Sequence, residues 1–352
     1  MLTIVGECDQ QLFGMKPAER LGRQCGMLGD RQLIAHASAV LSDDTIAWLA
    51  DHIGTVITSP KGRPLAVVVE PAEVDAARMA IVGEGGLAMT SADAIGPVYV
   101  RKLRRMLEPL ALSLADQPRG MVERKLFASV YKGVTDVVTK YAWPEPALWL
   151  TRGAAALGLS PNIVTVVGLI LTFVAGWQFY VGNLAVGMAA AWLMTLLDTV
   201  DGKLARCTGQ SSKWGNIFDH GVDLIHPPFW WWAWAEGLKV YGRPFEPVYE
   251  MLVIGAIVLG YVAQRIIEGL FMRRYGMHIH VWRRIDSQFR LITARRNPNM
   301  VILVFCLALG LPDLGIELVA LWTILSLIFH AVRLAQANAL SDRGQPIVSW
   351  LG

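Results

Sequence analysis

Long apolar runs separated by short polar segments occupy the chain after about residue 160. From Pro161 to Leu197 no Asp, Glu, Lys or Arg occurs, and only Gly182-Asn183 interrupts the run. Because a helix rises about 1.5 Å per residue, this run is long enough to cross a hydrocarbon core of about 30 Å nearly twice. We therefore predict a helical hairpin that turns at Gly182-Asn183.

Four further apolar segments predict four more membrane-spanning helices, giving six in total. We expect these helices at Gly215 to Gly237, Val248 to Met272, Pro298 to Pro312 and Asp313 to Ala339. Lys and Arg concentrate after the second and fourth spans, and such residues mark the cytoplasmic side. We therefore expect a multi-pass protein of the cell membrane with both termini in the cytoplasm. A group of tryptophans in the third span is expected to form an interfacial aromatic belt: Trp230, Trp231, Trp232 and Trp234.

The first 120 residues have a different pattern. Short apolar runs at Leu2–Val5, Thr55–Thr58 and Pro64–Glu70 predict strands, and helical patterns lie between them at Pro17–Leu28 and Pro71–Val82. This alternation is typical of an α/β domain. We expect a small cytoplasmic α/β domain over residues 1–120.

A juxtamembrane segment, residues 121–158, precedes the six-span domain of residues 159–352. Met121–Tyr141 combines apolar residues at helical spacing with interleaved lysines, which predicts an amphipathic helix on the membrane surface. The alternative is a linker helix packed on the soluble domain. The overall fold class is therefore mainly α.

Composition supports this division and excludes other classes. The chain is 54% hydrophobic and 17% charged, whereas soluble domains carry about 25% charged residues. A formal net charge of +3 is too small to indicate a nucleic-acid partner.

Four aspartates lie where the second and third spans meet the cytoplasm. Asp198 and Asp201 are three residues apart, and Asp219 and Asp223 are four apart, so each pair shares one helical face. A hairpin would bring the pairs together, where unpaired carboxylates are costly. Lys203 or Arg206 would neutralise one or two of them, and the others call for Mg²⁺ or Mn²⁺. The alternative is a set of separately solvated acids.

Small residues accompany the acids. Gly202, Ala205 and Gly215 lie where the helix faces meet the acidic cluster. Such residues allow helices to approach closely, or leave room for a flat ligand.

The resulting pattern, D-x2-D-G-x2-A-R-x8-G-x3-D-x3-D over residues 198–223, resembles the signature of the CDP-alcohol phosphotransferase family at every fixed position. Ser160 to Thr165 is similar to the family's entry to its first span. The resemblance covers about residue 121 to the C-terminus. It implies a six-helix membrane enzyme, usually a homodimer, that transfers a substituted phosphate from a CDP-alcohol to an acceptor hydroxyl and releases CMP.

The resemblance also implies roles for individual residues. Asp198, Asp201 and Asp219 would hold a pair of divalent ions, and Asp223 would lie near the ions and act as the general base. The cytidine diphosphate moiety would be contacted by residues of the signature and of the first span: Asn162, Thr165, Gly202, Ala205, Arg206, Ser212 and Gly215.

Acceptor binding requires other residues. Histidines and arginines crowd the segment between the fourth and fifth spans, and Arg295 and Arg296 abut the fifth span. We expect Arg295, Arg296 and Arg265 to contact a polar, anionic acceptor such as inositol phosphate or glycerol phosphate. The alternative for these arginines is binding to lipid headgroups. Arg265 and Glu268 are expected to form a buried pair. His278 and His280 have no third ligand nearby in the sequence and are expected at the surface.

The expected reaction belongs to phospholipid synthesis, with CDP-diacylglycerol as the donor. A CDP-inositol donor is an alternative within the same chemistry. A divalent-cation transporter is the alternative outside it, because acids inside a membrane often line ion paths. The N-terminal domain resembles a reduced nucleotidyltransferase domain that lacks a Gly-x-Gly-x-Arg loop, so we expect it to be catalytically silent.

Overall fold

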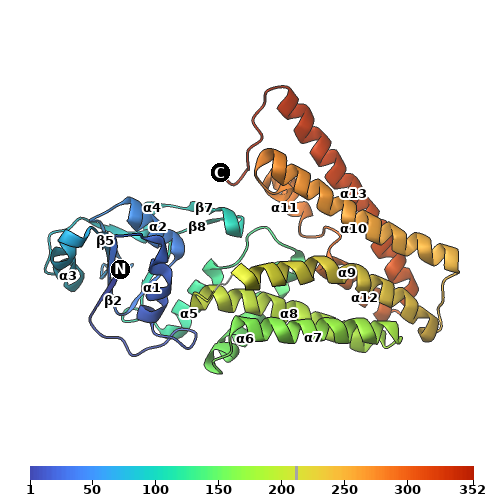
Figure 1. The fold of residues 1–352 in the computed structure, drawn as a ribbon, viewed down its shortest axis with the longest axis horizontal. Helices are drawn as coiled ribbons and strands as arrows, with labels where there is room; N and C mark the ends of the chain where they lie inside the picture. The colour runs from blue at the N-terminus through green and yellow to red at the C-terminus, as the bar shows by residue number, and fades with distance from the viewer. Residues whose placement is uncertain (211–212) are drawn as a thin grey trace. The chain divides into compact units, whose positions relative to one another are not determined.

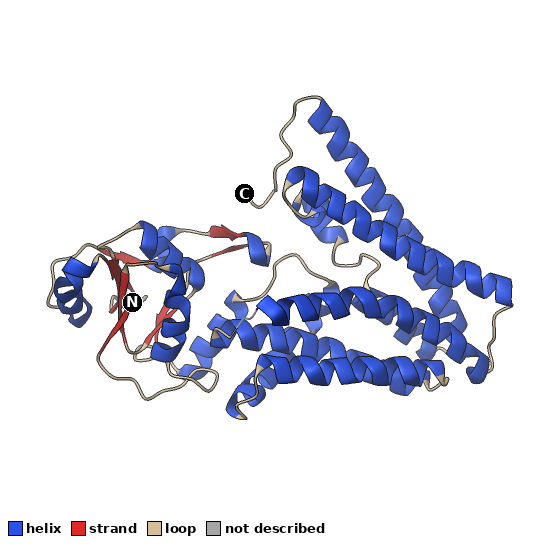
Figure 2. Ribbon diagram, in the orientation of Figure 1, coloured by secondary structure: helices blue, strands red, loops and turns tan. Residues whose placement is uncertain are grey.

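The computed structural model describes residues 1–210 and 213–352, with the side chains of residue 27, 213–220 and 222–223 outside the description. The chain divides into two compact units. The first contains residues 1–133, 148–161 and 200–211, and the second contains residues 134–147, 162–199 and 212–352. Strands are confined to the first unit, and long helices dominate the second (Figure 2).

A five-stranded sheet forms the centre of the first unit (Figure 1). Its strand order is β1-β2-β5-β4-β6, and β1 pairs parallel with β2 as β4 does with β6, while β5 is antiparallel to both its neighbours. The strands are β1 (Leu2–Val5), β2 (Gln32–His36), β4 (Val56–Thr58), β5 (Pro64–Val69) and β6 (Met89–Ser91). Two smaller sheets pair β3 (Ala39–Leu41) with β9 (Ala111–Ser113) and β7 (Val98–Val100) with β8 (Arg105–Leu107).

Helices cover both faces of this sheet. Side chains alternate between the faces along each strand, so Leu33 of β2 packs with α1 (Pro17–Gln24) and α2 (Asp43–Asp51). Ile34 packs on the other face with α3 (Val74–Val82). A short helix, α4 (Ala92–Ile95), follows β6. The α/β prediction for the N-terminal region is confirmed, although the sequence pattern missed the strands β2, β3, β6, β7, β8 and β9 and the helices α2 and α4.

The continuous helix predicted over Met121–Tyr141 is absent. Helix α5 (Arg119–Ser129) ends early, and the chain resumes helical geometry in the π-helical turn η4 (Val138–Ala142) and in α6 (Pro144–Ala156). Between α5 and η4 the chain passes close to Arg105, where a Cβ at Gly133 would lie 2.7 Å from Cβ of Arg105, so glycine is required at this position. Glu123 of α5 is buried and accepts from the backbone N–H of Phe13 and from Arg152. The packed-linker alternative therefore describes α5.

Six long or apolar helices build the second unit. They are α7 (Pro161–Tyr180), α8 (Leu184–Thr208), α9 (Lys213–Tyr241), α10 (Pro247–Tyr275), α12 (Arg296–Ala308) and α13 (Pro312–Asp342). Between α10 and α12 lie the 3-10 turn η5 (Ile279–Val281) and α11 (Arg284–Phe289). The hairpin turn predicted at Gly182-Asn183 is confirmed. A Cβ at Gly237 would lie 1.8 Å from the carbonyl oxygen of Phe179, so glycine is required where α9 passes the end of α7.

Four helices among the described residues are long and apolar enough to span a membrane: α7, α8, α10 and α13. Helix α12 has 13 residues and is about 20 Å long, which is shorter than a hydrocarbon core. Helices α10 and α13 lie side by side (Figure 1), with Gly260 against Thr323. Small residues at such crossings let apolar helices approach closely.

The tryptophan belt predicted for the third span is wrong for three of its four residues. Trp230, Trp231 and Trp234 are buried in the core between α7, α8, α9 and α13, and Trp232 alone of the four is exposed. The indole N–H of Trp230 donates to the carbonyl of Thr172, and that of Trp234 donates to Pro312. Their polar atoms are thus satisfied inside the bundle.

Candidate active site

The first half of the signature, residues 198–206, lies on the last turns of α8. Asp198 and Asp201 are one helical turn apart, and Asp201 is only 5% exposed. The guanidinium of Arg296, at the start of α12, donates to a carboxylate oxygen of Asp198 over 2.7 Å. We expected Lys203 or Arg206 to neutralise an acid, but the charge partner seen for Asp198 comes from a residue 98 positions away.

Lys203 is not directed at the acids. Its side chain is 3% exposed, its ammonium donates to the carbonyl of Val130 over 3.0 Å, and it lies 3.3 Å from the ring centroid of Tyr131. The hydrogen bond to this carbonyl and the cation–π contact compensate part of the free-energy cost of burying the Lys203 charge. The predicted neutralising role of Lys203 is therefore wrong.

Gly202, Ala205 and Arg206 share the partly exposed side of α8, whereas Leu204 and Cys207 are buried. Residues three and four apart are neighbours on a helix, and the guanidinium of Arg206 lies over Gly202. A Cβ at position 202 would be 3.1 Å from Nη2 of Arg206. The glycine thus leaves room for a planar cation on the helix surface.

The other predicted nucleotide contacts lie on α7, on α9 or outside the described residues. Asn162 is exposed and Thr165 is half-buried, both in the first turns of α7. Ser212 lies outside the described residues. Gly215 belongs to the first turn of α9, and the side chains of Asp219 and Asp223 on the same helix lie outside the description. The convergence of the four aspartates stays a prediction.

A second charged group lies within the C-terminal helices. The carboxylate of Glu268 on α10 accepts from Arg265 over 2.7 Å and from Arg295 over 2.6 Å, and it contacts Nε2 of His280 over 3.1 Å. We call these four residues, with His330 of α13, the Glu268 cluster. The predicted pair of Arg265 and Glu268 is confirmed.

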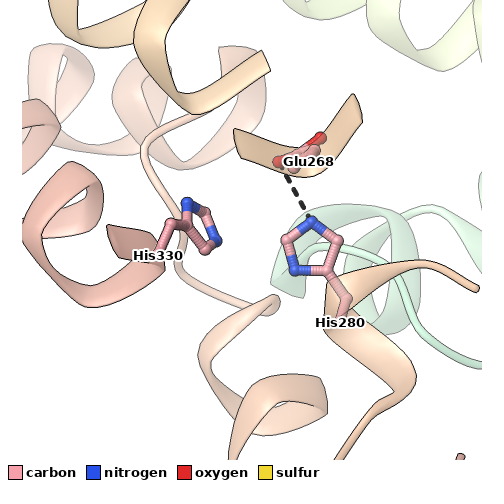
Figure 3. A group of neighbouring side chains, drawn as sticks. All are labelled: Glu268, His280 and His330. Carbon is pink, nitrogen blue, oxygen red and sulfur yellow. Dashed lines mark hydrogen bonds and ion pairs between the residues drawn. The ribbon is translucent and has the colours of Figure 1, made fainter. Parts of the chain in front are cut away.

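His280 and His330 complete the cluster from two further elements (Figure 3). His280 is 3% exposed and His330 is 1% exposed. Among the described residues, neither ring nitrogen of His330 has a hydrogen-bond partner. The surface position expected for His280 is wrong, and the third residue that the sequence seemed to lack is His330, 50 positions away. One ligand atom each from Glu268, His280 and His330 lie within 4.8 Å of one another.

The charge balance of the Glu268 cluster decides which ligand suits it. Glu268, His280 and His330 have the residue types of a metal site, but two arginines already bind the one carboxylate. Burial lowers the pKa of His280 well below its ordinary value, Glu268 opposes this shift, and Arg295 and Arg290 add to it. With His280 neutral, the two guanidinium groups outweigh the one carboxylate in charge. The cluster therefore favours an anionic ligand over a metal cation.

Two buried polar contacts hold the basic segment between α10 and α12 in place. Asp286 of α11 accepts from Nε and Nη2 of Arg333 on α13 over 2.5 and 2.8 Å. Asn297 at the start of α12 donates to Asp136 over 3.0 Å. Bidentate and buried bonds of this kind fix side-chain orientation. Arg295 and Arg296, which lie between the two contacts, are therefore held on a rigid frame.

The α8 motif lies in a region of the chain that matches a known family. Residues 158–287 match the sequence model of the family described as CDP-alcohol phosphatidyltransferase. This range contains all four signature aspartates. The match extends to Glu268 and His280 but ends before Arg295 and His330.

Individual curated proteins align over parts of the chain. The archaetidylinositol phosphate synthase of Pyrococcus horikoshii is 34% identical over 81 residues, 23% of this chain and 43% of that protein. The phosphatidylinositol phosphate synthase of Mycobacterium tuberculosis is 28% identical over 124 residues, 33% of this chain and 55% of that protein. The chain thus spans about half the length of these curated relatives.

A solved structure of the Mycobacterium tuberculosis phosphatidylinositol phosphate synthase, with CDP-DAG bound, aligns with a TM-score of 0.43 and 16% identity. The alignment covers 54% of this chain and 94% of that chain.

Proposed function

We propose that the chain is an integral membrane phosphotransferase that moves a substituted phosphate from a CDP-alcohol to the hydroxyl of a polar acceptor. The observation that carries this proposal is the arrangement on α8, where Asp198 and Asp201 precede a glycine overlain by Arg206 within the matched domain. CDP-diacylglycerol is the proposed donor, CMP the leaving product and phospholipid synthesis the setting.

The donor set suits two Mg²⁺ or Mn²⁺ ions. Asp198, Asp201, Asp219 and Asp223 supply only carboxylate oxygens, the ligands that these ions prefer. The ion pair with Arg296 orients the Asp198 carboxylate. When bound, such ions neutralise charge on the diphosphate and on the departing CMP.

The side chains around the acids have distinct tasks in the proposed reaction. The acceptor oxygen bonds to the β-phosphorus of the CDP-alcohol, the bond from that phosphorus to the bridging oxygen breaks, and CMP leaves with the bridging oxygen. Asp223 takes the proton of the attacking hydroxyl, because a neutral alcohol is a poor nucleophile. Arg206 binds a phosphate with its planar fork. Asn162, Thr165, Gly202, Ala205, Ser212 and Gly215 are the proposed contacts of the cytidine diphosphate.

The Glu268 cluster is the proposed acceptor subsite. Arg265 and Arg295 bring two guanidinium groups to one buried carboxylate, and the unpartnered nitrogens of His330 offer hydrogen bonds to a hydroxyl-bearing ligand. Arg296 links this region to Asp198. A phosphorylated polyol, inositol phosphate or glycerol phosphate, fits this chemistry. The names of the two curated relatives favour inositol phosphate.

A donor of the CDP-inositol type is the alternative within the same chemistry. It would place the polyol on the nucleotide side and leave the Glu268 cluster to bind a phosphate of the second substrate. A panel of CDP-alcohols with each acceptor distinguishes the two assignments.

The proposal includes a place in the cell. We propose six spans in the cell membrane, with both termini and the active site on the cytoplasmic side. The four long apolar helices and the arginines that follow α10 support this topology. The homodimer is proposed from the family resemblance. We also propose that residues 1–120 have no nucleotidyltransferase activity.

The direct test is release of CMP from CDP-diacylglycerol by the purified protein with inositol phosphate, with and without Mg²⁺ or Mn²⁺. The proposal expects release that needs both the metal and the acceptor. Absence of CMP release across a panel of CDP-alcohols, together with metal-ion flux in proteoliposomes, would instead favour the transporter.

A further inference from the structure

The last turn of α8 is held by two arginines of the N-terminal domain. Helix C-termini leave four backbone carbonyls without intrahelical partners. Nε of Arg20 donates to the carbonyl of Cys207 over 3.0 Å, and Nη1 of Arg23 donates to that of Thr208 over 2.7 Å. Both arginines lie on α1, and a cation at a helix C-terminus is also favoured by the helix dipole.

Arg20 connects this helix end to the core of the N-terminal domain. The side chain is 4% exposed, and its Nη1 also donates to the carbonyl of Leu41 over 2.6 Å and to the Gln24 amide oxygen over 3.0 Å. Gln24 in turn donates to Asp43 at the start of α2. A buried guanidinium whose donors reach the backbone of both β3 and α8 fixes those two segments relative to α1.

The chain leaves α8 in a turn that fits Arg23. Gly209 has a φ of +64°, a left-handed conformation that favours glycine, and a Cβ there would lie 3.2 Å from Cβ of Arg23. The N–H of Gln210 donates to the carbonyl of Ala205 over 2.8 Å. The final turn therefore closes against α1.

The same turns of α8 are held on a second element. Lys203 donates to the carbonyl of Val130, beyond the end of α5, and lies over the Tyr131 ring. Its side of the helix is buried, whereas Gly202 and Arg206 keep partial exposure. Residues 200–211 group with the N-terminal domain as one compact unit.

We propose that the N-terminal domain is a positioning element for the cytidine-diphosphate-binding turn of α8, acting through Arg20 and Arg23. This inference rests on the proposed function, because it takes Gly202 and Arg206 as nucleotide contacts. Neither Arg20 nor Arg23 touches the nucleotide. They fix the register and rotation of the turn that does, and small displacements of a binding group cost large factors in affinity and rate. The domain thus has a role without any chemistry of its own.

The test measures binding of CMP to the full-length protein by calorimetry, in the presence of Mg²⁺. Arg20→Met removes all three of the donor contacts described above, Arg20→Lys keeps one charged donor, and Arg23→Ala removes a single bond from an exposed side chain. Arg31→Ala is the matched control, since Arg31 donates to the carbonyl of Ala50 within the same domain.

We expect the Kd for CMP to rise about tenfold or more in Arg20→Met and about threefold in Arg23→Ala, scaled from the loss of charged hydrogen bonds. Arg20→Lys should recover part of the affinity, and Arg31→Ala should match the wild type. Amide hydrogen exchange at residues 203–210 should become faster in Arg20→Met.

Three results would contradict the inference in different ways. A lower melting temperature with unchanged CMP affinity in both Arg20→Met and Arg23→Ala would make the contacts purely structural. Equal loss in Arg31→Ala would assign the effect to domain stability. Failure of the wild-type protein to bind CMP would overturn the proposed function itself and the inference with it.

Discussion

The end of α8 and the Glu268 cluster are both charged groups inside an apolar bundle, but their charge balances are opposite. Two aspartates lie one turn apart on α8, with Arg296 on one of them, whereas Glu268 alone faces Arg265 and Arg295. Charges in such surroundings are costly unless they are paired. An excess of carboxylates suits cations and an excess of guanidinium groups suits anions. In the proposed function, the α8 acids therefore take the metal-bound diphosphate and the Glu268 cluster takes the phosphorylated acceptor.

The largest effect is expected from substitution of the aspartates on α8. Asp201→Asn should lower the rate of CMP release by roughly a thousandfold or more. The reason is that it removes a proposed charged ligand of the ions that stabilise the leaving group. The measurement is CMP release against Mg²⁺ concentration. Asp342→Asn is the control, since Asp342 is an exposed partner of Arg274. An unchanged metal titration in Asp201→Asn would contradict the ligand role.

Asp223→Asn should separate binding from turnover. Since the proposed base is needed only as the acceptor oxygen attacks, the CDP-alcohol should still bind, with an affinity within about threefold of wild type, while turnover is lost. Equilibrium binding and single-turnover rates measure the two quantities. Retained activity would rule out Asp223 as the base.

An intermediate effect is expected from substitution of an arginine in the Glu268 cluster. Arg295→Met removes one of two guanidinium groups from the Glu268 cluster, and the KM for the phosphorylated acceptor should rise about 10- to 100-fold. The KM for the donor should change less than threefold. Arg274→Ala is the control, since Arg274 is a more exposed arginine in the last turn of α10. Equal changes in the two KM values would show that the cluster does not distinguish the acceptor.

The smallest effect is a pH dependence of stability from His280. Its folded pKa lies well below the ordinary 6.5, because of burial, so the unfolded chain binds the proton first. Stability should therefore be unaffected by His280 above pH 6.5 and fall by about 1 kcal/mol per pH unit below it. The measurement is unfolding midpoints from pH 7.5 to 5.5. His280→Gln should flatten the slope and exposed His52→Gln should not; equal slopes in both variants would contradict this assignment.

Local patterns in the sequence were sufficient for some of these features. The hairpin turn, the strands Leu2–Val5 and Pro64–Val69, and the face shared by Gly202, Ala205 and Arg206 all follow from periodicity or spacing within one or two elements. The pair of Arg265 and Glu268 was predictable for the same reason, being three residues apart on one helix.

Tertiary contacts determined the rest. Arg296 meets Asp198 across 98 positions, and His330 joins His280 from another helix, so spacing gave no signal for either. The tryptophans of α9 were misassigned because an interfacial belt and a packed core have the same composition. What distinguishes the core is that the indole N–H groups of Trp230 and Trp234 donate to the carbonyls of Thr172 and Pro312. The close approach of Gly133 to Arg105, past the end of α5, is likewise a tertiary contact that the spacing of Met121–Tyr141 did not indicate.

Binding of Mn²⁺ measured by electron paramagnetic resonance tests the central claim most directly. The purified protein should bind close to two Mn²⁺ ions per chain, more tightly when CDP is present, and Asp198→Asn or Asp201→Asn should lose at least one of them. A wild-type protein that binds no Mn²⁺, or variants that bind as much as the wild type, would contradict the account.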